Sequence, residues 1–348
     1  MRLPAPVRRG LLLATLSIAV LSIAACAGGP PATKPWAETA ARELHLSLAS
    51  FELQGRRVTV TRGAFATGAL PVVVYLPGIG QEGDAGQRWA AAWAQAGYAV
   101  LGVQPLAEDA AAWRSPLART GEFRALGELH YGEALRTQRL QALRSLIAAL
   151  KAQPAVAGAT LDWQHMAVAG YETGAQTALD LGGDASGWRP QAVIAISPPP
   201  MASPAGEAAA LLVTGDNDGD ALGLVTRPAE RRRAFDGLSP GAGWLLSLPG
   251  VSHAALAGTL APEGWHVQDQ HRGGEAAMGG MGGGRRGGMG GEQGAHRPAG
   301  GAPRGPRSGS ATEAAQADLQ DALRLSTAFL DARLRGAAMP AGALLQAR

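Results

Sequence analysis

The chain has 348 residues, of which 46% are hydrophobic and 17% charged, enough to build one large domain or two small ones. Its formal net charge of +3 comes mainly from arginines at the extreme N-terminus and in a glycine-rich segment near the C-terminus. The rest of the sequence is acidic on balance, which argues against a nucleic-acid-binding protein. A single cysteine excludes any disulfide within the chain.

The N-terminus is typical of an export signal. Arginines in residues 1–9 precede an apolar run, residues 10–23, that is too short to span a membrane comfortably. The run ends at Ala24-Ala25-Cys26, which resembles the lipobox of bacterial lipoproteins. The resemblance implies removal of residues 1–25, lipidation of Cys26 and anchoring to the cell envelope, on the periplasmic side of the outer membrane. An ordinary secretory signal with an incidental cysteine is the alternative.

The chain then alternates between strand-like and helix-like patterns. We expect a tether over residues 26–44 with a short helix at its end, then two antiparallel strands at 46–53 and 57–62. Apolar runs predict core strands at 72–76, 98–103, 166–169, 191–197, 208–214 and 244–248. Helical spacing predicts helices at 88–96, 133–152, 175–181 and 312–334. This alternation predicts an α/β fold with a mostly parallel central sheet flanked by helices.

Two segments break the alternation. Residues 106–131 are irregular, and we expect a cap or lid over a pocket there. Residues 272–310 are rich in glycine, with too few apolar side chains to offset the entropy of ordering them. We therefore expect a disordered insertion between a domain at 45–271 and its closing helix at 311–335, with a tail at 336–348.

The insertion offers two further interpretations. Its methionines, together with nearby histidines, contain the thioether and imidazole ligands that Cu(I) prefers: His266, His271, His296, Met278, Met281 and Met289. Such residues in a glycine-rich segment are more often solvated linker, so we predict no metal and no cofactor. Its arginines either contact anionic envelope polymers or only keep the segment solvated.

One stretch carries the strongest chemical signal. Met166–Ala169 is a short buried strand, a helix begins near Ala175, and Gly170 and Gly174 bracket the sharp turn between them. Glycines at these two places allow strand and helix to approach closely around a strained central residue. The pattern is the G-x-S-x-G nucleophile elbow, except that its central residue is Glu172.

At this point the chain resembles the α/β-hydrolases, in particular the dienelactone-hydrolase and platelet-activating-factor-acetylhydrolase-like bacterial branch. The resemblance covers roughly residues 46–334 without the insertion. It rests on four motifs in the order of that fold, each at the end of an expected strand. They are PVVVYLPGIG at 71–80, GYETG at 170–174, TGDND at 214–218 and GVSHAAL at 250–256.

The resemblance implies a role for each matching position. His253 would be the general base, and Asp218 would orient it, with Asp216 and Asp220 as rival acids. Backbone N–H groups of Ile79 and Thr173 would form the oxyanion hole.

Glu172 leaves three mechanisms open, because a serine-type alkoxide is impossible at that position. In the first mechanism Glu172 is a carboxylate nucleophile, as aspartate is in haloalkane dehalogenases and epoxide hydrolases, although the longer glutamate side chain must curl back to reach the substrate carbon. Alternatively it is a general base for water, or it pairs with His253 in a degenerate site. We expect an envelope-anchored hydrolase of a small ester or related bond, with a non-catalytic binding or structural lipoprotein as the alternative.

Overall fold

The structure is a computed structural model that describes residues 35–184, 189–200, 208–259 and 308–348. The expected signal peptide, the lipidation site Cys26 and the copper-ligand candidates lie outside the described residues, as does the glycine-rich insertion up to residue 307. Within the described residues, no helix is both long enough and apolar enough to cross a membrane.

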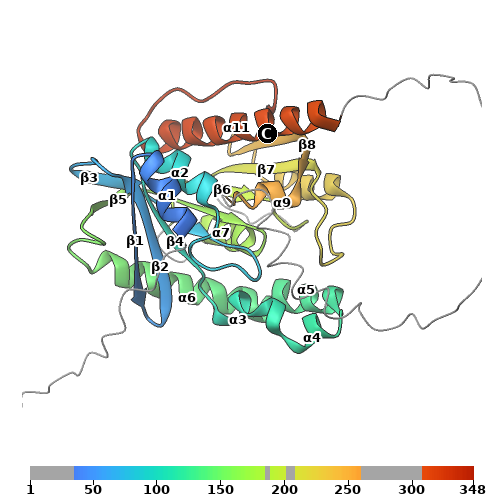
Figure 1. Cartoon of the computed structure of the whole chain (residues 1–348). Coiled ribbons are helices and arrows are strands. Elements are labelled where there is room, and N and C mark those ends of the chain that lie inside the picture. The colour runs from blue at the N-terminus through green and yellow to red at the C-terminus, as the bar shows by residue number, and fades with distance from the viewer. Residues whose placement is uncertain (1–34, 185–188, 201–207, 260–307) are drawn as a thin grey trace, which may run out of the picture. The chain divides into compact units, whose positions relative to one another are not determined.

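The described residues build a single mixed sheet of nine strands (Figure 1). The strands are β1 (Leu46–Leu53), β2 (Arg56–Gly63), β3 (Ala69–Leu76), β4 (Ala99–Val103), β5 (Thr160–Tyr171), β6 (Ala192–Ile196), β7 (Ala209–Asn217), β8 (Gly243–Ser252) and β9 (Leu345–Ala347). Their order across the sheet is β1-β2-β4-β3-β5-β6-β7-β8-β9. The six central strands, β4, β3, β5, β6, β7 and β8, are parallel to one another, whereas β1 pairs antiparallel with β2, β2 with β4, and β9 with β8. The predicted α/β class and the mostly parallel sheet are thereby confirmed.

Helices lie on both faces of this sheet, with α11 along one face and α6 along the other (Figure 1). The helical segments are α1 (Pro35–Glu43), α2 (Gln87–Gln95), α3 (Ala107–Ala110), η1 (Ala112–Arg114), α4 (Pro116–Arg119), α5 (Phe123–Tyr131), α6 (Glu133–Lys151), α7 (Thr173–Gly183), η2 (Pro228–Arg231), α8 (Arg232–Asp236), α9 (His253–Leu256) and α11 (Ser308–Leu334).

The alternation of side chains along the strands divides the core into two layers. In β3, Val73 and Tyr75 face the layer formed by α2 and α11, and Val72 and Val74 face the layer formed by α6 and α7. Successive strand residues point to opposite faces, and here both faces are covered, so the strand is apolar throughout. This is why the continuous run of apolar residues at 72–76 predicts a central strand.

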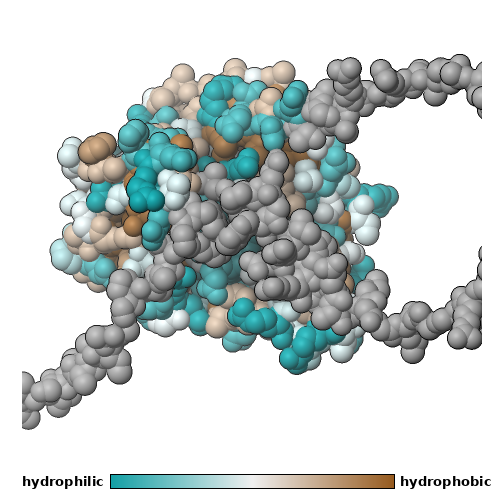
Figure 2. Space-filling view, viewed as in Figure 1, coloured by the Kyte–Doolittle hydropathy of each residue, from teal (hydrophilic) through white to brown (hydrophobic). Residues whose placement is uncertain are grey.

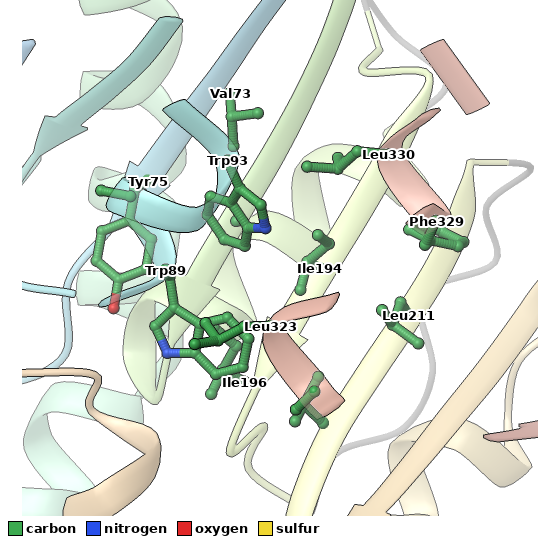
Figure 3. Close-up of a cluster of buried hydrophobic side chains, with 14 of the residues drawn as sticks. Val73, Tyr75, Trp89, Trp93, Ile194, Ile196, Leu211, Leu323, Phe329 and Leu330 are labelled. Carbon is green, nitrogen blue, oxygen red and sulfur yellow. The ribbon is translucent and has the colours of Figure 1, made fainter. Parts of the chain in front are cut away.

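Two tryptophans of α2 fill the first layer (Figure 3). Trp89 and Trp93 are fully buried with ring centroids 5.9 Å apart. Each indole N–H has an acceptor: Leu256 O at 2.9 Å for Trp89 and Ser326 Oγ at 3.1 Å for Trp93. These bonds tie α2 to α9 and α11, and so connect the C-terminal helix to the strands that carry the candidate site. Satisfied N–H groups allow such large rings to be buried without a desolvation penalty.

Two expectations need correction, one about residues 336–348 and one about residues 106–131. Residues 345–347, expected to belong to a tail, form β9 and extend the sheet by pairing with β8. The alternation over these three residues is too short to signal a strand, so the sequence does not reveal it. Residues 106–131 are not irregular but contain the short helices α3, η1, α4 and α5, which we call the cap segment. Hydrophilic side chains are visible near α4 at the lower edge of the molecule in Figure 2.

Candidate active site at the carboxyl edge of the sheet

The turn between β5 and α7 holds its central residue in a strained conformation. Glu172 has φ 51° and ψ −115°, a left-handed backbone that residues with a side chain seldom adopt. A Cβ at Gly170 would collide with the backbone of Gly174, and a Cβ at Gly174 would collide with the carbonyl of Leu76. The two glycines therefore allow the close approach expected from the sequence, and the turn projects Glu172 beyond the sheet edge.

Three side chains distant in the sequence meet at this edge. Glu172 follows β5, Asp218 follows β7 and His253 follows β8. The His253 ring lies between the two carboxylates: Nε2 is 2.6 Å from Glu172 Oε1, and Nδ1 is 2.6 Å from Asp218 Oδ1. Both contacts have hydrogen-bonding length, so the ring links the two acids. The geometry brings together the three residues that the motifs single out.

Asp218, rather than either rival acid, is the partner of the histidine. Its buried carboxylate also accepts hydrogen bonds from the Ser197 and Thr214 hydroxyls, at 2.8 to 2.9 Å. Asp220 instead accepts backbone N–H groups of its own loop, and Asp216 is exposed. With this many donors, the Asp218 carboxylate is held in a fixed orientation toward His253.

A buried arginine that the sequence did not identify supports the acid. Arg231 is 1% exposed, and its Nε lies 3.1 Å from Asp218 Oδ2. It also donates to the carbonyl oxygens of Asp218, Ser197 and Pro198. Arg231 belongs to a run of three arginines, and charge runs are usually solvated, so no sequence signal separates it from its neighbours. Its guanidinium balances the negative charge of Asp218 inside the protein.

The second oxygen of Glu172 lies on the expected oxyanion donor. The Ile79 N–H donates to Glu172 Oε2 at 3.1 Å. Glutamate reaches this position because Gly78 has no side chain: a Cβ there would collide with the same carboxylate oxygen. Thr173, the other predicted donor, is the fully buried first residue of α7. The role of its N–H in an oxyanion hole stays a prediction. Glu172 is thus bound at both oxygens, one by His253 and one by the turn at residues 77–80, which we call the oxyanion turn after its expected role.

The cap segment fixes this oxyanion turn. Gly80 N–H donates to Asp109 O at 2.7 Å, and Trp113 Nε1–H donates to Ile79 O at 3.2 Å. The Asp109 carboxylate is itself bound by two buried side chains, His130 Nδ1 at 2.7 Å and Arg139 Nε at 2.6 Å. Burial alone would raise the pKa of Asp109, but the His130 and Arg139 contacts hold it below its usual range. A rigid ionic cluster thus anchors the peptide that contacts Glu172.

The two carboxylates make His253 a strong base. Burial of the ring and the charge of Arg231 lower its pKa, but the hydrogen bonds with Asp218 and Glu172 and the Glu172 charge raise it to about 9. At neutral pH the ring is therefore an imidazolium between two carboxylates. In this resting state His253 holds a proton that it can donate, and it becomes a proton acceptor only if one of its acidic partners loses its charge.

A cavity of about 470 Å³ opens above Glu172 and His253. Its wall comes from the oxyanion turn, the cap segment and the loops after β5, β7 and β8, and includes Ile79, Gln81, Trp113, Tyr171, Asp220 and Leu222. Sites for small molecules typically have volumes of this order. The reactive side chains therefore face a space large enough for a small substrate.

Neither a metal site nor a related protein identifies the chemistry further. In the part of the chain that the structure describes, no three His, Cys, Asp or Glu side chains gather as a metal-ligand set. No protein-family model matches the chain, and no curated protein matches it.

Proposed function

We propose that the protein is an α/β-hydrolase-fold enzyme that cleaves a C–O bond in a small ester or related compound through a Glu172 carboxylate nucleophile. The observation that carries the proposal is that the two carboxylate oxygens of Glu172 contact different groups. Oε1 lies at the proton-bearing His253 Nε2, and Oε2 lies on the Ile79 N–H. One oxygen thus lies beside a proton donor and the other beside an N–H that can stabilise a developing negative charge.

The first step uses the resting protonation state. Glu172 Oε1 leaves its hydrogen bond with His253 and attacks the electrophilic carbon, forming a C–Oε1 bond while the substrate's C–O bond breaks. The departing oxygen takes the proton from His253 Nε2. The products of this step are an alkyl ester of Glu172, a neutral imidazole and the protonated leaving oxygen, which is a hydroxyl group on the same alkyl chain for an epoxide and a released carboxylic acid for an ester.

The second step follows from the loss of charge at Glu172. Two of the causes that raise the pKa of His253 involve the Glu172 carboxylate, and both disappear once it is esterified. The neutral ring then takes a proton from water, whose oxygen attacks the Glu172 carbonyl carbon. Negative charge develops on Oε2, which already lies 3.1 Å from the Ile79 N–H. Collapse breaks the Cδ–Oε1 bond, releases an alcohol that carries Oε1, and restores the carboxylate and the imidazolium.

The geometry favours attack at a saturated carbon. An acyl substrate needs the Ile79 N–H for its own developing oxyanion, but Glu172 Oε2 already accepts that bond. A substrate attacked at an alkyl carbon leaves the bond in place. Since His253 supplies a proton to the departing oxygen, an epoxide matches the site best among the related C–O bonds.

The sheet supports the hydrolase assignment. The order β1-β2-β4-β3-β5-β6-β7-β8, with β2 antiparallel, is the arrangement of α/β-hydrolases. The nucleophile, acid and base positions fall after β5, β7 and β8, as they do in that fold.

A substrate panel tests the function. Purified protein is assayed with short-chain esters, terminal epoxides and haloalkanes, alongside Glu172→Gln and the exposed control Glu82→Gln. We expect turnover of at least one C–O substrate, lost by about 10³-fold or more in Glu172→Gln and kept in Glu82→Gln. Equal rates in the wild type and Glu172→Gln would exclude the carboxylate mechanism.

A non-catalytic binding protein is the second candidate, because the bonds at both Glu172 oxygens also describe a self-satisfied, closed site. In that case the wild type turns over nothing on the panel, whereas Glu172→Ser gains esterase activity from the remaining Asp218–His253 pair.

We also propose that the protein is anchored to the cell envelope by a lipid, and this location is tested separately from the activity. If Cys26 carries the lipid anchor, Cys26→Ala moves the protein from the membrane fraction to the soluble fraction.

A further inference from the structure

The cap segment places a tryptophan, Trp113, at the wall of the cavity. Trp113 is 39% exposed, one of the few large apolar side chains so exposed in the described part of the chain. It lines the cavity that contains Glu172 and His253. The exposed part of the ring therefore presents apolar surface to whatever enters the cavity.

Three contacts hold the Trp113 ring in place. Its Nε1–H donates to Ile79 O at 3.2 Å, and Phe123 packs edge-on at a centroid distance of 6.0 Å. The indole lies so close over Gly80 that a Cβ there would collide with it. A ring fixed in this way loses little entropy when a flat group packs against it, which is the property of a preorganised binding wall.

The charges at the cavity wall disfavour an anionic ligand. The charged residues that line it are Glu172, Asp220 and His253, and no lysine or arginine is among the lining residues of the described chain. The His253 charge is shared between two carboxylates, and Asp220 is bound by two backbone N–H groups. The buried Arg231 does not line the cavity: it donates to carbonyl oxygens, pairs with Asp218 and has Nη2 4.0 Å from Asp220 Oδ2. A carboxylate or phosphate entering here would lose hydration beside the carboxylates of Glu172 and Asp220 without gaining an unpaired cation, so binding of an anion is disfavoured.

From these observations we infer that the cavity binds an uncharged substrate whose flat apolar group, such as an aryl ring, packs against Trp113 while its electrophilic carbon faces Glu172. The inference rests on the proposed function for the position of the reacting carbon. The selectivity for a neutral aryl group depends only on the cavity wall.

Binding of three unreactive probes tests the inference. Benzamide, benzoate and cyclohexanecarboxamide have similar sizes and differ in charge or flatness. Their dissociation constants are measured by ligand-detected NMR for the wild type and for Trp113→Ala, Trp113→Phe and the remote, exposed control Phe65→Ala. Thermal unfolding and circular dichroism verify that each variant is folded.

We expect benzamide to bind about tenfold more tightly than benzoate, and more tightly than cyclohexanecarboxamide. Trp113→Ala should weaken benzamide binding by about fivefold or more, whereas Trp113→Phe, which keeps a flat ring but loses the bond to Ile79 O, should retain most of it. The inference is overturned if benzoate binds as well as benzamide, if no probe binds at millimolar concentration, or if Trp113→Ala leaves benzamide binding unchanged. It is also overturned if Trp113→Phe loses as much affinity as Trp113→Ala, because Trp113 would then act only through the oxyanion turn.

Because no probe is turned over, this result is independent of catalysis. Selective benzamide binding without any activity on the substrate panel would refute the proposed function alone. Carboxylate-dependent turnover without selective binding would refute this inference alone.

Discussion

Replacing Glu172 by glutamine removes a negative charge 2.6 Å from His253 Nε2 and leaves the side chain almost unchanged in shape. The account predicts that this change lowers the pKa of His253. In the wild type that pKa is about 9 against an ordinary 6.5, which corresponds to about 3 kcal/mol in favour of the protonated ring.

The size of the change follows from the causes of that rise. Burial and Arg231 oppose protonation, whereas the Asp218 hydrogen bond, the Glu172 hydrogen bond and the Glu172 charge favour it. Two of the three favourable causes involve Glu172. We therefore expect Glu172→Gln to lose at least half of the gain, about 1.5 kcal/mol, and to lower the pKa of His253 by about 1 or more.

The assay is NMR of the imidazole nitrogens as a function of pH, with the His253 signal assigned by its loss in His253→Asn. Glu82→Gln, an exposed substitution of the same type, controls for the overall change in charge. A pKa in Glu172→Gln that stays at the wild-type value, or rises, would refute the argument that Glu172 holds the proton on His253.

Three further outcomes follow from the structure. Asp109→Asn should lower the free energy of unfolding by about 3 kcal/mol, measured by urea denaturation, because it removes the carboxylate that pairs with the buried Arg139 guanidinium and contacts His130. The exposed Glu108→Gln should change it little. Gly174→Ala should lower the free energy of unfolding by more than about 3 kcal/mol, because its Cβ would collide with the backbone of β3. The control is Gly342→Ala, where there is room for the methyl group. Equal losses in the two variants would contradict the close packing at the turn. Because the folded-state pKa of His253 is raised, its stabilising contribution of about 3 kcal/mol is complete below about pH 6.5 and is lost as the pH rises through 9. Urea denaturation from pH 6 to pH 10 should show this loss in the wild type and a flatter curve in His253→Asn.

The sequence predicts those parts of the fold that depend on periodic burial. The apolar run at 72–76 and the glycine-bracketed turn at 170–174 correspond to β3 and the β5–α7 turn, because a strand covered on both faces and a close backbone approach each leave a clear residue pattern. The sequence also predicts that Glu172, Asp218 and His253 lie close together, because loops after parallel strands meet at one edge of the sheet.

The sequence does not predict contacts that depend on side-chain conformation or on distant charges. The bond from the Ile79 N–H to Glu172 depends on how a flexible carboxylate bends, and no local pattern encodes that. Arg231 belongs to a run of arginines of the kind that is usually solvated, and Asp109 to a segment without a clear pattern. Only the tertiary arrangement buries these two side chains. Short elements such as β9 have too few residues for their alternation to be significant.

The most direct test of the central claim, that Glu172 forms a covalent bond with the substrate, is isotopic labelling during turnover in H₂¹⁸O. If water attacks the Glu172 carbonyl carbon, mass spectrometry of the peptide that contains Glu172 will show ¹⁸O in its carboxylate after repeated turnovers, and the first product molecules will carry unlabelled oxygen. Label that appears only in the product, with Glu172 unlabelled throughout, would contradict the account.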